Sequence, residues 1–72
     1  MVTELLIIRA KDDYYRFKDG SYFPCRLNKG SVFPLGQVEK AKKLCTILQK
    51  DGIAEVSLMK LTIVEEPYLI AS

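Results

Sequence analysis

Few residues of this sequence carry side chains suited to catalysis or metal binding. It has no histidine, and its two cysteines, Cys25 and Cys45, lie far apart with no Cys-x-x-Cys spacing. A structural zinc site needs four cysteine or histidine ligands, and a serine or cysteine nucleophile needs a neighbouring base. The acidic pairs Asp12–Asp13 and Glu65–Glu66 lie in polar stretches typical of solvated turns. We therefore expect no enzyme activity, no metal and no cofactor.

One group of residues does indicate a binding chemistry. In the first 30 residues, lysines and arginines are interleaved with tyrosines and phenylalanines. Aromatic rings on a sheet can stack on nucleic-acid bases while neighbouring cations neutralise phosphates. The candidate nucleic-acid face consists of Tyr14, Arg16, Lys18, Phe23 and Arg26. Because the net charge is only +2, nucleic-acid binding is the alternative function and not the preferred one.

Length and composition predict one small globular domain spanning residues 1–72. Hydrophobic residues make up 49% and charged residues 28% of the sequence, which is ordinary for a folded domain. No apolar run approaches the length of a membrane span, and Met1–Ala10 lacks the features of a signal peptide. We expect a cytoplasmic protein without membrane attachment. There, Cys25 and Cys45 are expected to be reduced and buried, with a disulfide between them as the alternative.

Four strands are expected, at about residues 3–10, 14–18, 21–27 and 54–64. Between the second and third, Asp19-Gly20 predicts a type I′ hairpin turn, which needs positive φ at both central residues. This turn pairs Lys18 with Ser21 and, three positions further, Tyr15 with Pro24. Proline cannot donate a ladder hydrogen bond, so we expect the third strand at a sheet edge.

A single amphipathic helix is expected at about residues 34–51. Pro34 suits its first turn, and Gly52 suits the position after its end, where positive φ is favoured. Its apolar stripe is Val38, Ala41, Leu44, Cys45 and Leu48. The opposite face carries Lys40, Lys42, Lys43 and Lys50. We interpret that face as solvated, with contact to an acidic partner as the alternative.

The polarity pattern of the last strand changes phase along its length. Ala54, Val56 and Leu58 alternate with polar residues, whereas beyond Met59 the apolar residues fall on the other parity. A β-bulge near Leu58–Met59 explains such a change. A strand buried on both sides is the alternative.

These elements predict an α+β fold with a four-stranded, mostly antiparallel sheet in the chain order β-β-β-α-β. A right-handed crossover through the helix brings the last strand beside the first and parallel to it. The expected strand order is therefore 4-1-2-3, with the helix packed on one face.

One helix cannot cover both faces of this sheet, because the first strand is apolar on both sides. The candidate self-association face consists of Leu5, Ile7, Tyr14, Phe23, Met59, Leu61 and Ile63. A monomer rarely exposes so large an apolar patch. The C-terminal segment Tyr68–Ile70, a second copy or another protein partner could cover it, and we prefer a homodimer because small cores often need such support.

The sequence therefore favours a small binding protein that associates with itself. Alanine at Tyr14 and Phe23 is expected to weaken self-association if this is correct. If the nucleic-acid alternative holds, the same changes would reduce nucleic-acid retention and leave the oligomer intact.

Overall fold

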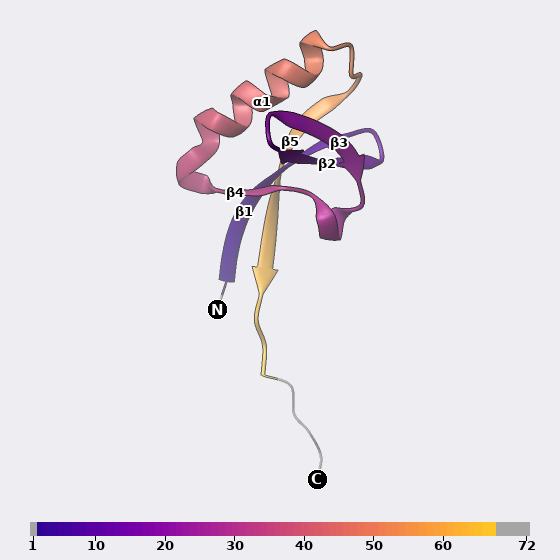
Figure 1. The fold of residues 1–72 in the computed structure, drawn as a ribbon. Helices are drawn as coiled ribbons and strands as arrows, with labels where there is room; N and C mark the ends of the chain where they lie inside the picture. Colours follow the sequence, from indigo (N-terminus) through magenta and orange to yellow (C-terminus); the bar gives the residue numbers. More distant parts are fainter. Residues whose placement is uncertain (1, 68–72) are drawn as a thin grey trace.

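The computed structural model describes residues 2–67. Within them, one α-helix packs on one side of an antiparallel sheet of five strands (Figure 1). The α+β class and the order of the predicted strands are confirmed. The structure differs from the prediction in one additional strand and in the direction of the last one.

The central strand is β1 (Val2–Ala10), which has neighbours on both edges. Along one edge it pairs over its whole length with β5 (Val56–Val64), and the two strands form a long antiparallel ribbon. Two strands share its other edge. β4 (Val32–Pro34) pairs with the middle of β1, and β2 (Asp13–Lys18) pairs only with its last two residues.

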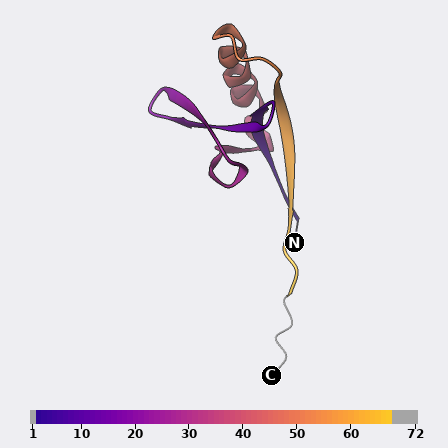
Figure 2. The same ribbon diagram turned by 90° about the vertical axis from the view of Figure 1, so that its right-hand side faces the viewer.

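The β2–β3 hairpin forms as predicted. β3 (Ser21–Cys25) pairs with β2 in the expected register, from Lys18 opposite Ser21 to Tyr15 opposite Pro24. Asp19 and Gly20 have φ of 51° and 75°, as a type I′ turn requires. β3 is the end strand on this side of the sheet, which agrees with the position of Pro24. The hairpin projects away from the β1–β5 ribbon (Figure 2).

Ser31 fills the gap that opens where β2 separates from β1. Its backbone N–H donates to the carbonyl of Tyr15 at 3.0 Å. The backbone N–H of Phe17 donates to the Ser31 hydroxyl oxygen at 2.8 Å. Ser31 thus supplies the hydrogen bonds that a strand neighbour would otherwise provide to β2.

Replacing Ser31 with alanine is expected to lower the free energy of unfolding by about 1–2 kcal/mol, because the partly buried Phe17 N–H loses its acceptor. Urea denaturation followed by circular dichroism measures this. Ser57→Ala is the matched control, since the Ser57 hydroxyl is exposed, its hydrogen bond to the Arg9 carbonyl is long at 3.5 Å, and its other acceptor is the weakly accepting sulfur of Met59. If both variants lost the same stability, Ser31 would not support β2 in this way.

The last strand runs antiparallel to β1, so the predicted parallel orientation is wrong. The reason is β4, a three-residue strand that the sequence analysis did not predict and that reverses the chain once more before the helix. β4 and β5 are both antiparallel to β1 and therefore parallel to each other, and the helix connects them. The prediction that the last strand lies beside the first is confirmed.

No β-bulge interrupts β5, because its register with β1 is continuous from Val56 to Val64. β5 is not buried on both sides either, since its residues are half-buried or exposed. Val56 and Leu58 pack against the helix-side core. Beyond them, Lys60 and Thr62 occupy the same face, and the apolar residues move to the opposite one. The change of phase marks where the helix stops covering the strand.

The helix α1 (Val38–Lys50) follows a 3-10 turn at Leu35–Gln37, and Pro34 closes β4 instead of starting the helix. The predicted stripe packs on the sheet, with Ala41 and Leu48 fully buried. The core on this side also contains Leu6, Ile8, Ala10, Tyr15 and Phe33. After the helix, Gly52 takes the expected positive φ of 89°. The third strand ends two residues earlier than predicted, because Leu27–Lys29 form a 3-10 turn, η1.

Candidate functional site

The sheet face opposite the helix carries a continuous set of apolar side chains. Directly opposed residues of an antiparallel pair lie on the same face. Leu5 is opposite Leu61, and Ile7 is opposite both Met59 on β5 and Val32 on β4. We call this the open face; its apolar members on the ribbon are Leu5, Ile7, Met59, Leu61 and Ile63.

The turn η1 covers part of the open face. Ile7 is fully buried, although it points away from the helix-side core. A Cβ atom built on Gly30 would lie 2.8 Å from Cδ1 of Ile7 and 3.3 Å from Cβ of Tyr14. The backbone at Gly30 therefore packs directly on this part of the sheet and covers Ile7. A side chain at position 30 would prevent this close packing.

Beyond Gly30 the open face is uncovered and forms a shallow groove, which we call the ribbon groove. Its apolar lining consists of Leu5, Leu27, Val32, Leu61 and Ile63, with Arg26 and Asn28 as the polar lining residues. Leu27, Val32 and Ile63 are exposed. No carboxylate belongs to the lining within residues 2–67, so the groove is apolar with one cation.

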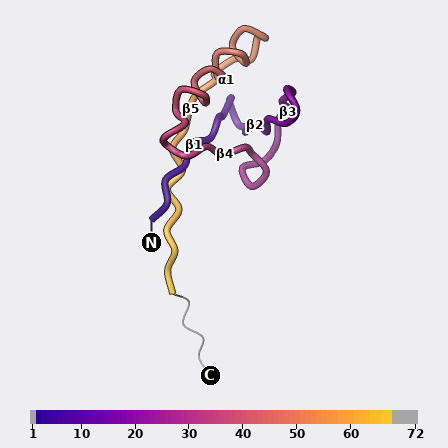
Figure 3. Tube along the Cα trace, turned by 60° about the vertical axis from the view of Figure 1, so that its left-hand side comes forward, coloured from indigo at the N-terminus to yellow at the C-terminus, as the bar shows by residue number. Residues whose placement is uncertain are grey.

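The free end of the ribbon is amphipathic. The first residues of β1 and the last residues of β5 leave the body of the protein together (Figure 3). On the helix-side face of this free end, Lys60 forms an ion pair with Glu4 at 2.9 Å, and Thr62 lies opposite Glu4. On the other face lie Leu61 and Ile63. Thr3 lies opposite Ile63, and the exposed Val2 and Val64 form the last pair on the helix-side face. Inside that last pair, the helix-side face is mainly polar and the opposite face mainly apolar.

The predicted self-association residues divide into three groups. Leu5, Leu61 and Ile63 come together in the ribbon groove. Met59 is exposed one pair further along the ribbon, beside the buried Ile7. Tyr14 and Phe23 lie on the hairpin strands and do not line the groove.

Two groove residues, Leu27 and Val32, were not predicted to belong to the site. Leu27 was predicted at the end of a strand and Val32 in the segment before the helix. Neither residue was therefore assigned to the apolar face of the sheet. The available signal was the presence of apolar residues on both sides of a short polar loop, Asn28–Ser31.

The candidate nucleic-acid residues come together only in part. Arg16 and Phe23 are opposed on the hairpin and both are exposed, as is Lys18. The guanidinium carbon of Arg9 lies over the Tyr14 ring, 5.9 Å from its centroid. One face of that ring is therefore occupied by a cation of the same chain. Arg26 lines a hollow together with Asp12 and Asp13 and also reaches the ribbon groove.

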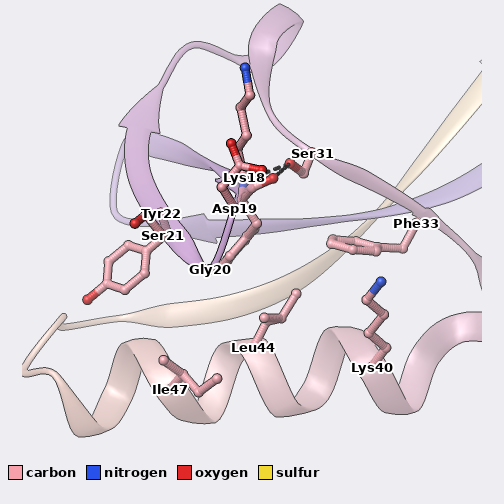
Figure 4. A pocket seen from close by; sticks show the side chains of 11 residues that line it. Lys18, Asp19, Gly20, Ser21, Tyr22, Ser31, Phe33, Lys40, Leu44 and Ile47 are labelled. Atoms are coloured by element: carbon pink, nitrogen blue, oxygen red, sulfur yellow. Dashed lines mark hydrogen bonds between the residues drawn. The ribbon is translucent and has the colours of Figure 1, made fainter.

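A second hollow lies between the hairpin and the helix, with a volume of about 320 Å³ (Figure 4). Its lining includes the apolar side chains of Phe17, Phe33 and Leu44 and the charged side chain of Lys40. Where the hairpin meets the end of the helix, the Tyr22 hydroxyl donates to a carboxylate oxygen of Asp51 at 2.6 Å. This hydrogen bond favours the protonated phenol and raises the pKa of Tyr22.

The cysteines and acidic residues form no ligand cluster. Among residues 2–67, no three cysteine, aspartate or glutamate side chains gather where they could hold a metal ion. Cys25 and Cys45 are free and half-buried, and burial raises the pKa of the Cys45 thiol. In the same residues, no helix has the length and apolar character needed to cross a membrane. Residues Tyr68–Ile70, predicted as one possible cover, lie outside the described residues.

Comparison with known proteins adds no family. No protein-family model matches the sequence, and neither curated proteins nor solved structures gave a significant match.

Proposed function

We propose that this chain is a small, non-enzymatic binding protein of the cytoplasm that associates with a second copy of itself through the ribbon. The observation that carries the proposal is the amphipathic free end. Its apolar face continues into the ribbon groove, and nothing else among residues 2–67 covers that groove.

The energetics support association. Burying apolar surface contributes roughly 25 cal/mol per Å², and a domain of this size has little stability to spare. A second copy that covers Leu61 and Ile63 removes exposed apolar surface without requiring another change in the fold. Two-fold dimers are also the commonest assemblies of soluble proteins.

The ribbon-groove variant Ile63→Lys is expected to weaken self-association at least about tenfold, because a charge would replace an apolar contact with the second copy. Sedimentation velocity over a wide range of protein concentrations measures the dissociation constant. Ile63 is 48% exposed, so the substitution leaves the core of the single copy intact.

Ile47→Lys is the matched control. Ile47 is 46% exposed but lies on the helix, away from the ribbon groove, so its replacement is expected to leave the dissociation constant unchanged. A monomer mass at every concentration would contradict the proposal. Equal weakening by both variants would contradict the assigned surface.

The nucleic-acid alternative has one supporting observation: Arg16 and Phe23 lie opposite each other on the hairpin and both are exposed. Salt-dependent retention of single-stranded RNA by a monomeric protein, lost in Phe23→Ala, would favour this alternative over self-association.

A further inference from the structure

The outer edge of β5 has no strand beside it within the described part of the chain. β5 pairs with β1 along one edge only, and it lies at the margin of the molecule (Figure 2). Every second residue of an antiparallel strand directs its backbone N–H and C=O away from a given neighbour. The outer edge of β5 therefore presents a row of unpaired donors and acceptors.

β5 lacks the features that usually prevent such an edge from pairing. Native edge strands are typically short, or contain proline, a bulge or several charges. β3, at the other end of the sheet, follows this rule, since it has five residues and contains Pro24. β5 has nine residues, a regular register, no proline and one charged residue, Lys60.

We propose that β5 pairs antiparallel with β5 of a second copy, around a two-fold axis perpendicular to the sheet, so that the two sheets become one. This inference rests on the proposed self-association and specifies its geometry. The occupant of the edge is a second copy because the sequence of β5 is complementary to itself in one particular register.

The register follows from two constraints. Opposed residues must lie on the same face, so the register can shift only in steps of two residues. The longest overlap places Lys60 opposite Lys60 of the second copy, and directly opposed like charges are unfavourable. Moving the two-fold axis by one residue shifts every pair by two residues. With the axis at Met59, the apolar Leu61 lies opposite the polar Ser57 of the second copy. With the axis at Leu61, Leu61 lies opposite Leu61 of the second copy.

With Leu61 on the axis, the pairs match in polarity on both faces. On the open face, Met59 lies opposite Ile63 of the second copy. On the helix-side face, Leu58 lies opposite Val64, and Lys60 lies opposite the uncharged Thr62. The helix packs near the Val56 end of β5, so this register places the two helices at opposite ends of the paired strands. In this register Leu61 and Ile63 pack beside Leu61 and Met59 of the second copy, which covers part of their exposed apolar surface.

A charge exchange at Thr62 tests the register by sedimentation. Thr62→Lys places a cation opposite Lys60 of the second copy and is expected to weaken the dimer about tenfold. In its own chain the new lysine lies beside Glu4, so the single copy keeps its stability. Thr62→Glu places an anion opposite Lys60 of the second copy and is expected to strengthen the dimer. Equal effects of both variants would overturn the register.

Disulfide trapping separates this geometry from face-to-face stacking. Opposed Cα atoms in an antiparallel pair are about 4.5–5.5 Å apart, within the range that a disulfide bridges. In a background with Cys25→Ser and Cys45→Ala, oxidised Leu61→Cys is expected to form a covalent dimer. Val32→Cys, exposed on the open face but on the far side of β1, is expected to remain monomeric.

The possible outcomes distinguish the two proposals. A dimer by sedimentation that is trapped by Val32→Cys and not by Leu61→Cys would overturn edge pairing while leaving the proposed self-association intact. A monomer at all concentrations that neither variant traps would overturn both. Trapping by Leu61→Cys alone, with opposite effects of the two Thr62 variants, supports the edge-paired dimer.

Discussion

Replacing Leu48 with alanine is expected to lower the free energy of unfolding by about 2–5 kcal/mol. Leu48 is fully buried, and its side chain belongs to the cluster that joins the helix to Ile8 and Phe33. The substitution removes apolar atoms and leaves a cavity that close-packed neighbours fill only in part. Since a domain of this size has few kcal/mol to lose, this is the largest effect that we expect from a single substitution.

Urea denaturation followed by circular dichroism measures the loss. Ile47→Ala is the matched control, because the adjacent Ile47 is about half exposed and its truncation is expected to cost less than about 1 kcal/mol. Where Leu48→Ala does not fold at all, Leu48→Met conserves volume and should cost less than about 1.5 kcal/mol. Equal losses for Leu48→Ala and Ile47→Ala would show that the helix does not pack as described.

Gly30→Ala is expected to destabilise the fold by about 1–3 kcal/mol through overpacking. The backbone at Gly30 has φ of −67°, which any residue adopts, so the effect is steric. The new methyl group would lie 2.8 Å from Cδ1 of the fully buried Ile7. Relief would require the buried Ile7 side chain to change its rotamer or η1 to move away from the sheet.

A double-mutant cycle with Ile7→Val tests this cause. Ile7→Val removes the obstructing Cδ1 atom and by itself costs about 0.5–1.5 kcal/mol. The double variant is expected to lose less stability than the sum of the two single variants, because the remaining clash is small. Gly36→Ala is the control, since a Cβ there meets no atom within 4 Å. Additive losses in the cycle would contradict the close packing described for Ile7.

The features that the sequence predicted correctly depend on local chemistry. Asp19-Gly20 can adopt the two positive φ values of a type I′ turn, and the turn then fixes the register of the whole hairpin. The spacing of Ala41 and Leu48 places both on one side of a helix irrespective of the sheet beneath them. These elements need no information from distant parts of the chain.

The features that the sequence missed depend on distant contacts. β4 has only three residues, one of them Pro34, and it is a strand only because β2 leaves an edge of β1 unpaired. Without β4, the last strand before the helix would be β3, which runs in the same direction as β1. A crossover from β3 would then make β5 parallel to β1, as predicted. The bulge predicted at Leu58–Met59 was wrong for a similar reason. The polarity of β5 changes where the helix ceases to cover the strand, and that point depends on the packing of the helix and not on the sequence of β5.

The candidate site was predicted in the same partial way. Leu5, Leu61 and Ile63 follow from alternation in two strands that pair, and the structure brings them together. The burial of Ile7 under η1 depends on a turn that crosses the sheet, and no periodicity indicates it. Tyr14 and Phe23 share the parity of the open face, but Phe23 belongs to β3, and the β2–β3 hairpin projects away from the ribbon (Figure 2).

Amide hydrogen exchange of residues 56–64, measured residue by residue at low and high protein concentration, tests the role of the ribbon most directly. Edge pairing predicts that alternate amides of β5 exchange more slowly at high concentration, because the outward N–H groups gain carbonyl partners from the second copy. Amides of β3 should exchange equally at both concentrations. Unchanged exchange throughout β5, with a dimer present or absent, would contradict the edge-paired ribbon.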